Sequence, residues 1–279
     1  MRSFVLGLLA SALFAPLAAA QTIDRIRDTG VMTIGFRADA DPLSYADAQG
    51  LAAGYTPRIC AALARAIASE LSIDGLRVSF VSVGASDRFD KVASGEIDLL
   101  CGAATITLSR RELVDFSIPV YVDGAAVALP AGAGTDLADL AGKSVGVHGN
   151  TTTEQALRNS LEKAGVEATV VTFDDHNSGF AALLAGEVDG YFADQSILVG
   201  LFVRNEVGAG FNISDNILTI EKQGLALARG DTEFRLLVDR ILSVFYANGT
   251  MRQTFETALP GVRPGAAMRA LYLIAPELP

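Results

Sequence analysis

The amino-acid sequence predicts an α/β protein that is built from two lobes of similar design. Three observations support this prediction: the first 20 residues look like a cleavable leader, strand-like and helix-like segments alternate along the remaining chain, and one helix-to-strand junction occurs twice. Alternation of strands with helices is typical of sheets that are covered by helices.

The leader has the layout of a secretory signal peptide. Arg2 gives a short basic start, residues 5–17 are mainly apolar, and three alanines end at Ala20. This apolar stretch is too short for a good membrane span, and no cysteine follows it to take a lipid. We therefore expect cleavage near Ala20 and a soluble, periplasmic chain that begins near Gln21.

The length and the charge of the remaining chain limit its domain organisation and its possible partners. About 259 residues follow the leader, enough for one large domain or for two lobes of roughly 100 to 150 residues each. The formal net charge is −10, and no basic run is present. Nucleic acid is therefore not an expected partner, although an acidic surface can also serve solubility alone.

Strand-like runs and a first helix can be located along the chain. Thr56 and Pro57 predict an N-cap and the first helical residue, and apolar residues then recur at helical spacing. The spaced residues are Ile59, Leu63, Ile67 and Leu71, and the strand-like runs are 31–36, 78–83, 97–101, 144–148 and 168–173.

The repeated junction predicts the second lobe. Residues 89–98 read FDKVASGEID, and residues 180–189 read FAALLAGEVD. Each segment predicts a helix that ends at a glycine with a left-handed backbone, followed at once by a buried strand. Chance similarity of two such junctions is the alternative. The strand and helix patterns on either side favour two lobes of one design.

We place the lobes at residues 21–122 and 123–222, and we expect residues 223–279 to return to the first lobe. Residues 225–228 resemble a strand, and a helical face follows from Thr232. That face carries Phe234, Leu237, Val238, Ile241 and Leu242. A chain that crosses twice between lobes has a hinge, and a cleft between lobes is a favoured ligand site.

Two cysteines and two histidines bear on disulfide and metal chemistry. Cys60 and Cys101 can form one disulfide in an oxidising compartment, or they can remain two buried thiols. There is no CxxC motif, and His148 and His176 lack the spacing of metal ligands. We therefore expect no metal and no cofactor.

Polar residues at strand ends suggest an anion site. The segment from Ala103 to Arg110 directly follows the run 97–101, and open α/β sheets bind ligands at such strand ends. Hydroxyl groups such as that of Thr105, beside one guanidinium, suit a carboxylate. The alternative is an ordinary N-cap at Thr107, with Arg110 and Arg111 in solvent.

The second lobe offers similar residues. Thr151 and Glu154 form a capping-box pattern after the run 144–148, and amides at a helix start also attract anions. Asp194 follows another strand-like segment, where its carboxylate can receive an ammonium or cap a helix. No nucleophile elbow, P-loop or paired-acid motif occurs, so we do not expect an enzyme.

Six motifs together resemble the periplasmic amino-acid-binding proteins of ABC transporters, family 3 of the bacterial extracellular solute-binding proteins. The resemblance covers nearly all of the mature length. The motifs are PLSY at 42–45, GY at 54–55, GEID at 95–98, TIT with the arginine at 105–110, VDFSIP at 114–119 and LAGK at 140–143.

This resemblance implies the type II periplasmic-binding-protein fold, with a mixed sheet in each lobe and two hinge crossovers. It also implies ligand-binding roles. Arg110, aided by Thr105 and Thr152 and beside Ala103, would hold the α-carboxylate of an L-amino acid, and Asp194 would hold its ammonium. The implied partners are this ligand and a membrane permease, and we expect a monomer.

Some positions depart from the family pattern. Thr56 stands where most relatives carry an acid, and Ala40 stands where several place an aromatic residue that stacks on the ligand. Asn150 replaces a common glycine, so we expect asparagine in a left-handed backbone conformation, which it tolerates better than most residues.

Three further residues resemble those of glutamate and aspartate binders: Arg37, Arg88 and His176. Each lies on a loop that leaves a strand-like run, hence at the rim of the expected cleft. They favour an acidic ligand, because guanidiniums and an imidazole can neutralise a side-chain carboxylate. The alternatives are surface charges at all three positions, and a ligand such as glutamine, asparagine or a range of polar amino acids.

The leading hypothesis is a non-enzymatic binding protein that presents an amino acid to a permease. An exported lyase of the cyclohexadienyl or arogenate dehydratase type, which shares the fold, is the alternative from another class. A sensor that reports ligand occupancy to a receptor is the third.

Overall fold

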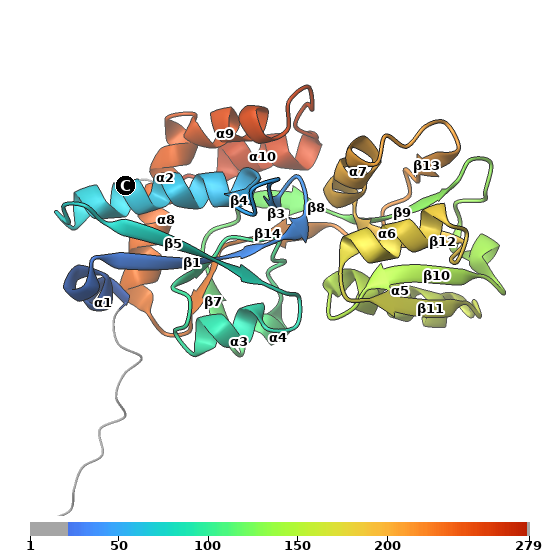
Figure 1. Cartoon of the computed structure of the whole chain (residues 1–279), viewed down its shortest axis with the longest axis horizontal. Helices are drawn as coiled ribbons and strands as arrows, with labels where there is room; N and C mark the ends of the chain where they lie inside the picture. Colours follow the sequence, from blue (N-terminus) through green and yellow to red (C-terminus); the bar gives the residue numbers. More distant parts are fainter. Residues whose placement is uncertain (1–21, 278–279) are drawn as a thin grey trace, which may run out of the picture.

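The computed structural model describes residues 22–277, so the predicted signal peptide lies outside the described residues. Figure 1 shows two lobes that lie side by side, each with a central sheet and helices packed against it. Within the described range, no helix is long and apolar enough to cross a membrane.

The first lobe contains a mixed five-stranded sheet of order β5-β1-β6-β15-β7. Strands β5 and β6 run parallel to β1, whereas β15 is antiparallel to both β6 and β7. The bounds are β1 Val31–Arg37, β5 Arg77–Val83, β6 Leu99–Leu100, β7 Val114–Phe116 and β15 Ala226–Ala228. A short sheet, β2 Asp39–Ala40, β3 Ser44–Ala46 and β4 Ala52–Ala53, adjoins it.

Helices from both ends of the chain form the core of this lobe. Ile59 and Leu63 of α2 share one buried cluster with Phe234 and Leu242 of α8, which explains why the segment after residue 222 packs here. The helices are α1 Thr22–Thr29, α2 Tyr55–Glu70, α3 Arg88–Ala93, α4 Leu108–Arg111, α8 Thr232–Ala247, α9 Thr250–Ala258 and α10 Ala266–Ile274.

The second lobe has the same arrangement of strand directions. Its sheet has the order β11-β10-β12-β9-β13, with β11 and β12 parallel to β10, and with β9 antiparallel to β12 and β13. The strands are β9 Ala125–Pro130, β10 Ser144–His148, β11 Thr169–Phe173, β12 Gly190–Asp194 and β13 Phe211–Ile213. The helices are η1 Leu137–Leu140, α5 Thr152–Ala164, α6 His176–Leu184 and α7 Gln195–Arg204.

The repeated sequence junction occupies equivalent places in the two lobes. Gly95 follows α3 with φ 76°, and Gly186 follows α6 with φ 74°. Each glycine turns the chain from a helix into a strand that pairs in parallel with its neighbour, β6 with β1 and β12 with β10. Two lobes of one design were therefore predicted correctly.

Two short strands connect the lobes. β8, Tyr121–Asp123, pairs antiparallel with β14, Glu221–Gln223, between the two sheets. The boundaries that we propose, after residues 122 and 222, fall inside these strands. The hinge is thus a paired ribbon, which limits how the lobes can move relative to each other.

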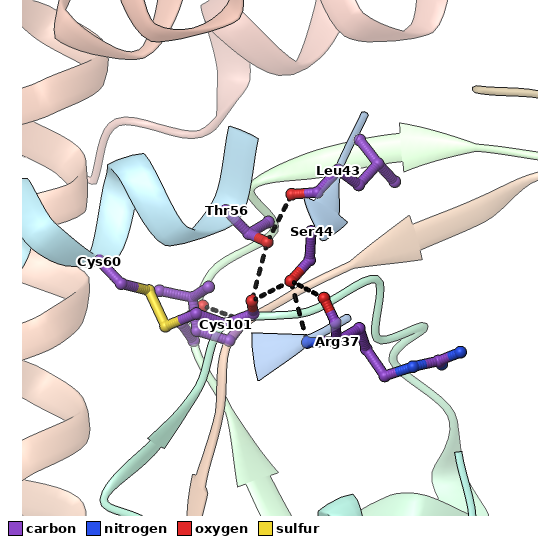
Figure 2. The surroundings of a disulfide bond; sticks show 8 residues. Arg37, Leu43, Ser44, Thr56, Cys60 and Cys101 are labelled. Carbon is purple, nitrogen blue, oxygen red and sulfur yellow. Dashed lines mark hydrogen bonds between the residues drawn. A yellow bond between two sulfur atoms is a disulfide. The ribbon is translucent and has the colours of Figure 1, made fainter. Parts of the chain in front are cut away.

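The predicted N-cap of α2 at Thr56, with Pro57 as the first helical residue, was wrong. Gly54, with φ 108°, is the N-cap, and the helix begins at Tyr55. A β-carbon on Gly54 would lie 2.8 Å from the carbonyl oxygens of Pro42 and Leu43, so this close approach requires glycine. The Thr56 hydroxyl instead lies within hydrogen-bond distance of the Leu43 and Cys101 carbonyl oxygens, at 2.9 and 3.0 Å (Figure 2).

Of the two alternatives for the cysteines, the structure contains the disulfide. Cys60 of α2 and Cys101, directly after β6, are both fully buried, and their Cα atoms lie 6.4 Å apart (Figure 2). The bond therefore attaches α2 to the point at which the polar segment from Ala103 begins.

Replacing both cysteines by alanine is expected to lower the free energy of unfolding by about 2–4 kcal/mol, because the disulfide closes a loop between residues 41 positions apart. Urea unfolding without reductant measures this loss. Two titratable thiols in the unfolded, unreduced wild type, with unchanged stability of the variant, would contradict the prediction.

Candidate ligand-binding site between the lobes

A small cavity between the lobes contains all eight residues predicted to bind ligand. In this closed structure its volume, measured as the space open to the centre of a water molecule, is about 20 Å³. Arg37, Arg88, Ala103, Thr105 and Arg110 line it from the first lobe, and Thr152, His176 and Asp194 from the second. Thr151, Thr153 and Ile197, which were not predicted, also line it.

The lobes are closed on this cavity. The hydroxyl oxygens of Thr105 and Thr152 lie 3.3 Å apart across the cleft, and the His176 N–H donates to Asp39 at 3.2 Å. Arg204 of α7 forms an ion pair with Asp41 of the first lobe at 2.9 Å. Polar contacts therefore join the lobes on more than one side of the cavity.

Arg110 points into the cleft, and Thr107 also caps its helix. The Thr107 hydroxyl accepts the Arg110 N–H at 3.1 Å, so the N-cap that we considered as the alternative is present. The Arg110 guanidinium turns back and donates from Nη1 to the Thr105 carbonyl at 2.8 Å, while Arg111 is exposed. The solvent-exposed alternative therefore holds for Arg111 but not for Arg110.

Arg88 is a buried cation that lacks a complete set of partners. Its side chain is 2% exposed, and within residues 22–277 neither Nε nor Nη1 has a hydrogen-bond partner. Burial, together with repulsion from Arg37 and Arg110, lowers its pKa well below the usual arginine value. Buried donors are almost always paired in folded proteins, so this guanidinium needs an anion.

Arg37 is also buried, but its charge is balanced inside the protein. Nε and Nη2 each donate to one oxygen of Asp39 at 2.9 Å, and Nη2 lies 3.2 Å from Nδ1 of His148. Its backbone N–H donates to the Ser44 hydroxyl at 3.0 Å, which fixes the end of β1 (Figure 2). Burial raises the pKa of Asp39, but Arg37 and the two histidines outweigh it and lower that pKa to about 2.

Both histidines are buried and neutral at pH 7. Their rings meet edge to face with centroids 4.7 Å apart, and His176 Nδ1 lies 3.0 Å from the Tyr191 hydroxyl. Burial and nearby Arg37 lower the pKa of His148 to about 4, and burial above all lowers that of His176. In the ligand-free protein, His176 can therefore take part in hydrogen bonds as a neutral imidazole.

Surface positions, the alternative considered for Arg37, Arg88 and His176, are excluded. All three side chains are buried in the cleft.

Asp39, His148 and His176 bring potential metal-ligand atoms within 4.8 Å of one another. The Arg37 guanidinium bonds Asp39 and contacts His148 there, and a cation beside it would be repelled.

Asp194 lies at the N-cap position of α7, but its side chain does not cap the helix. It accepts hydrogen bonds from Thr153 at 3.2 Å and from Gln223 at 2.7 Å. Burial, followed by repulsion from Asp123 and Glu221, raises its pKa well above the usual value. A cation in the cavity would relieve this cost, so Asp194 suits an ammonium group.

Sequence reasoning missed the hinge residues beside the cavity. The Glu221 carboxylate accepts hydrogen bonds from Thr105 of the first lobe, from Thr152 of the second at 2.8 Å, and from Thr219 at 2.8 Å. Gln223 follows on the same strand. The sequence could have indicated Glu221 and Gln223, because they lie at the predicted second crossover between the lobes. A strand that crosses there must pass beside the cleft.

The start of α5 follows its predicted capping pattern. The Thr151 hydroxyl accepts the Glu154 N–H at 3.1 Å, and the Glu154 carboxylate accepts the Asn150 N–H at 2.9 Å. Asn150 has φ 59°, the left-handed conformation that its replacement of glycine led us to expect. This geometry orients the start of α5 toward the cavity.

A larger groove of about 740 Å³ lies beyond α7, and its walls are mainly apolar, including Val199, Val203 and Leu259. Its charged side chains are already partnered or exposed, because Arg204 pairs with Asp41, Asp123 accepts the Ser196 hydroxyl, and Arg263 is exposed. The small cavity instead contains Arg88, a buried guanidinium with unpaired nitrogens among the described residues, and is therefore the candidate ligand site.

Comparison with known proteins identifies the family. Residues 32–260 match the model of the bacterial extracellular solute-binding proteins, family 3. The chain belongs to this family. The predicted resemblance is confirmed, and the fold is the two-lobed type II periplasmic-binding-protein fold.

Three relatives illustrate the similarity. An L-glutamate/L-aspartate-binding protein of Pseudomonas aeruginosa is 27% identical over 98% of this chain and 92% of its own length. The solute receptor for L-cysteine of Neisseria gonorrhoeae has a TM-score of 0.77 at 25% identity, covering 88% of this chain and 98% of the receptor. An ancestral amino-acid-binding protein, described as a precursor of cyclohexadienyl dehydratase, has a TM-score of 0.73 at 27% identity, covering 85% of this chain and 99% of the ancestral protein.

Proposed function

We propose that the protein is exported to the periplasm, captures an acidic L-amino acid, glutamate or aspartate, in the interlobe cleft, and delivers it to an ABC transporter permease. The observation that carries the proposal is Arg88, a fully buried guanidinium with two unpaired nitrogens among the described residues. The relative that is named for binding L-glutamate and L-aspartate supports the same ligand class.

Apart from Arg37, which Asp39 balances, the charged side chains that line the cavity match the charges of such a ligand one to one. Arg110 would bind the α-carboxylate, Asp194 the ammonium, and Arg88 the side-chain carboxylate. Each charge-assisted hydrogen bond contributes about 1.5–3 kcal/mol in a site that is closed to water. A neutral side chain would leave the charge of Arg88 unbalanced, even where an amide oxygen accepts one of its hydrogen bonds.

Thr105 and Thr152 share the Glu221 carboxylate as a hydrogen-bond acceptor. In the closed structure, Thr105 and Thr152 donate to Glu221 from opposite lobes. We expect ligand binding to transfer these donors to the α-carboxylate that Arg110 holds. The closed form, which brings both hydroxyls together, thereby binds ligand better than an open form, and this difference in affinity drives closure.

Isothermal titration of protein freed of ligand by unfolding and refolding tests the proposal. Glutamate or aspartate should bind more tightly than glutamine and asparagine, and mass spectrometry of protein purified without refolding should find the acidic ligand. If no amino acid in the panel produced binding heat, the proposal would be abandoned.

Lyase activity needs a separate test, because one structural relative is described as a precursor of a dehydratase. We expect no aromatic product when the protein is incubated with prephenate or arogenate. Product formed by the wild type and lost on Asp194→Asn substitution would instead assign catalysis to the cleft.

A further inference from the structure

The end of the cavity that would receive the side chain of the ligand contains two guanidiniums, and these differ in their surroundings. Arg37 and Arg88 are each 2% exposed and are close enough to repel each other. Arg37 has a carboxylate partner that matches its fork, whereas Arg88 has none among residues 22–277. The two arginines are therefore not equivalent receptors for a ligand.

The partner of Arg37 is fixed in place. Both oxygens of Asp39 accept from Arg37 at 2.9 Å, and the second oxygen also accepts the backbone N–H of His176 at 3.2 Å. The Asp39 side chain is 14% exposed. His148 contacts Nη2 of Arg37, the nitrogen that also donates to Asp39. A bidentate pair held from both lobes does not separate easily to serve a ligand.

We propose that Asp39 determines specificity as a positioning residue: it occupies Arg37, and thereby limits the side-chain pocket to one unbalanced positive charge, that of Arg88. The pocket then takes an amino acid whose side chain carries one negative charge, and it rejects doubly charged side chains such as a phosphate ester. The inference rests on the proposed function, because it concerns the acidic ligand assigned there.

Asp39→Asn tests this role with little change in shape. Asparagine keeps an oxygen that can accept the His176 N–H, but it leaves the charge of Arg37 unbalanced. We expect the ratio of glutamate affinity to glutamine affinity to rise at least tenfold. Binding of O-phospho-L-serine, expected to be at least 100-fold weaker than that of glutamate in the wild type, should improve by a similar factor.

A charge-balanced control separates this role from a structural one. Arg37→Gln with Asp39→Asn removes both charges together and leaves the net charge of the pocket unchanged. The glutamate-to-glutamine ratio of this double variant should stay within about threefold of the wild-type ratio, even where both affinities fall. A general loss of packing would weaken the binding of every ligand by a similar factor. It would therefore not raise the glutamate-to-glutamine ratio of Asp39→Asn.

The outcomes distinguish the inference from the proposed function. If the wild type binds no acidic amino acid, the proposed function fails. If it binds glutamate but the ratio is unchanged or lower in Asp39→Asn, or falls more than tenfold in the double variant, the role of Asp39 is overturned. Wild-type protein that binds O-phospho-L-serine as tightly as glutamate overturns it too, whether or not the variants fold.

Discussion

Arg88→Met is expected to weaken glutamate and aspartate binding by about 150- to 5000-fold, while the affinity for glutamine and asparagine changes less than about fivefold. The ligand carboxylate would lose its counter-charge inside a closed cleft, and removing one partner of a buried ion pair costs about 3–5 kcal/mol. Isothermal titration with the four amino acids measures the difference.

The same substitution should act in the opposite direction on the ligand-free protein. The wild-type guanidinium is buried beside Arg37 and Arg110, with two nitrogens unpaired in the described part of the chain. Methionine of similar length removes this cost, so the free energy of unfolding should rise by about 1–3 kcal/mol. Urea unfolding without ligand measures it. A fall in both stability and acid binding would show that Arg88 has a structural role instead.

Arg110→Gln is the matched control for Arg88→Met. Arg110 also lines the cavity, but we assign it to the α-carboxylate, which every amino acid carries. Binding of acidic and amide ligands should therefore fall together in this variant. Equal losses for all ligands in the Arg88 variant would mean that the side-chain pocket has been assigned incorrectly.

The sequence predicted which residues meet in the cleft because strand order limits where a loop can lie. Arg37, the segment from Ala103 and Asp194 each lie at the end of a central strand, β1, β6 or β12. The carboxyl ends of parallel strands lie at one edge of a sheet, so residues far apart in sequence are brought together there. The repeated junction then indicated that two such edges face each other.

The partner of each side chain could not be predicted in the same way. Arg37 was expected to face the ligand, yet it pairs with Asp39, two residues away, and contacts His148 across the cleft. Side-chain rotamers and contacts between lobes decide between such partners, and neither has a local sequence signal. The start of α2 was wrong for a similar reason, because Gly54 is required by carbonyl groups of a neighbouring loop.

Closure of the lobes depends on a glycine that lies outside the ligand cavity. Gly200 is in α7 of the second lobe and packs against the backbone of Asp41 and Pro42 in the first. A β-carbon at Gly200 would overlap the Asp41 carbonyl oxygen and would lie 3.0 Å from Pro42 Cδ. One helical turn later, Arg204 pairs with the Asp41 carboxylate at 2.9 Å. The absent side chain therefore allows α7 to approach the first lobe.

Gly200→Ala is expected to weaken the binding of every ligand by about 5- to 150-fold without changing the preference among them, because overpacking costs about 1–3 kcal/mol in the closed form only. In the open form, alanine should stabilise α7 by up to about 1 kcal/mol. Small-angle scattering at saturating ligand should show incomplete closure. Gly208→Ala, which adds a methyl group where no atom lies within 4 Å, is the matched control. If Gly200→Ala bound ligand with wild-type affinity, the contact of α7 with Asp41 and Pro42 would have no part in closure.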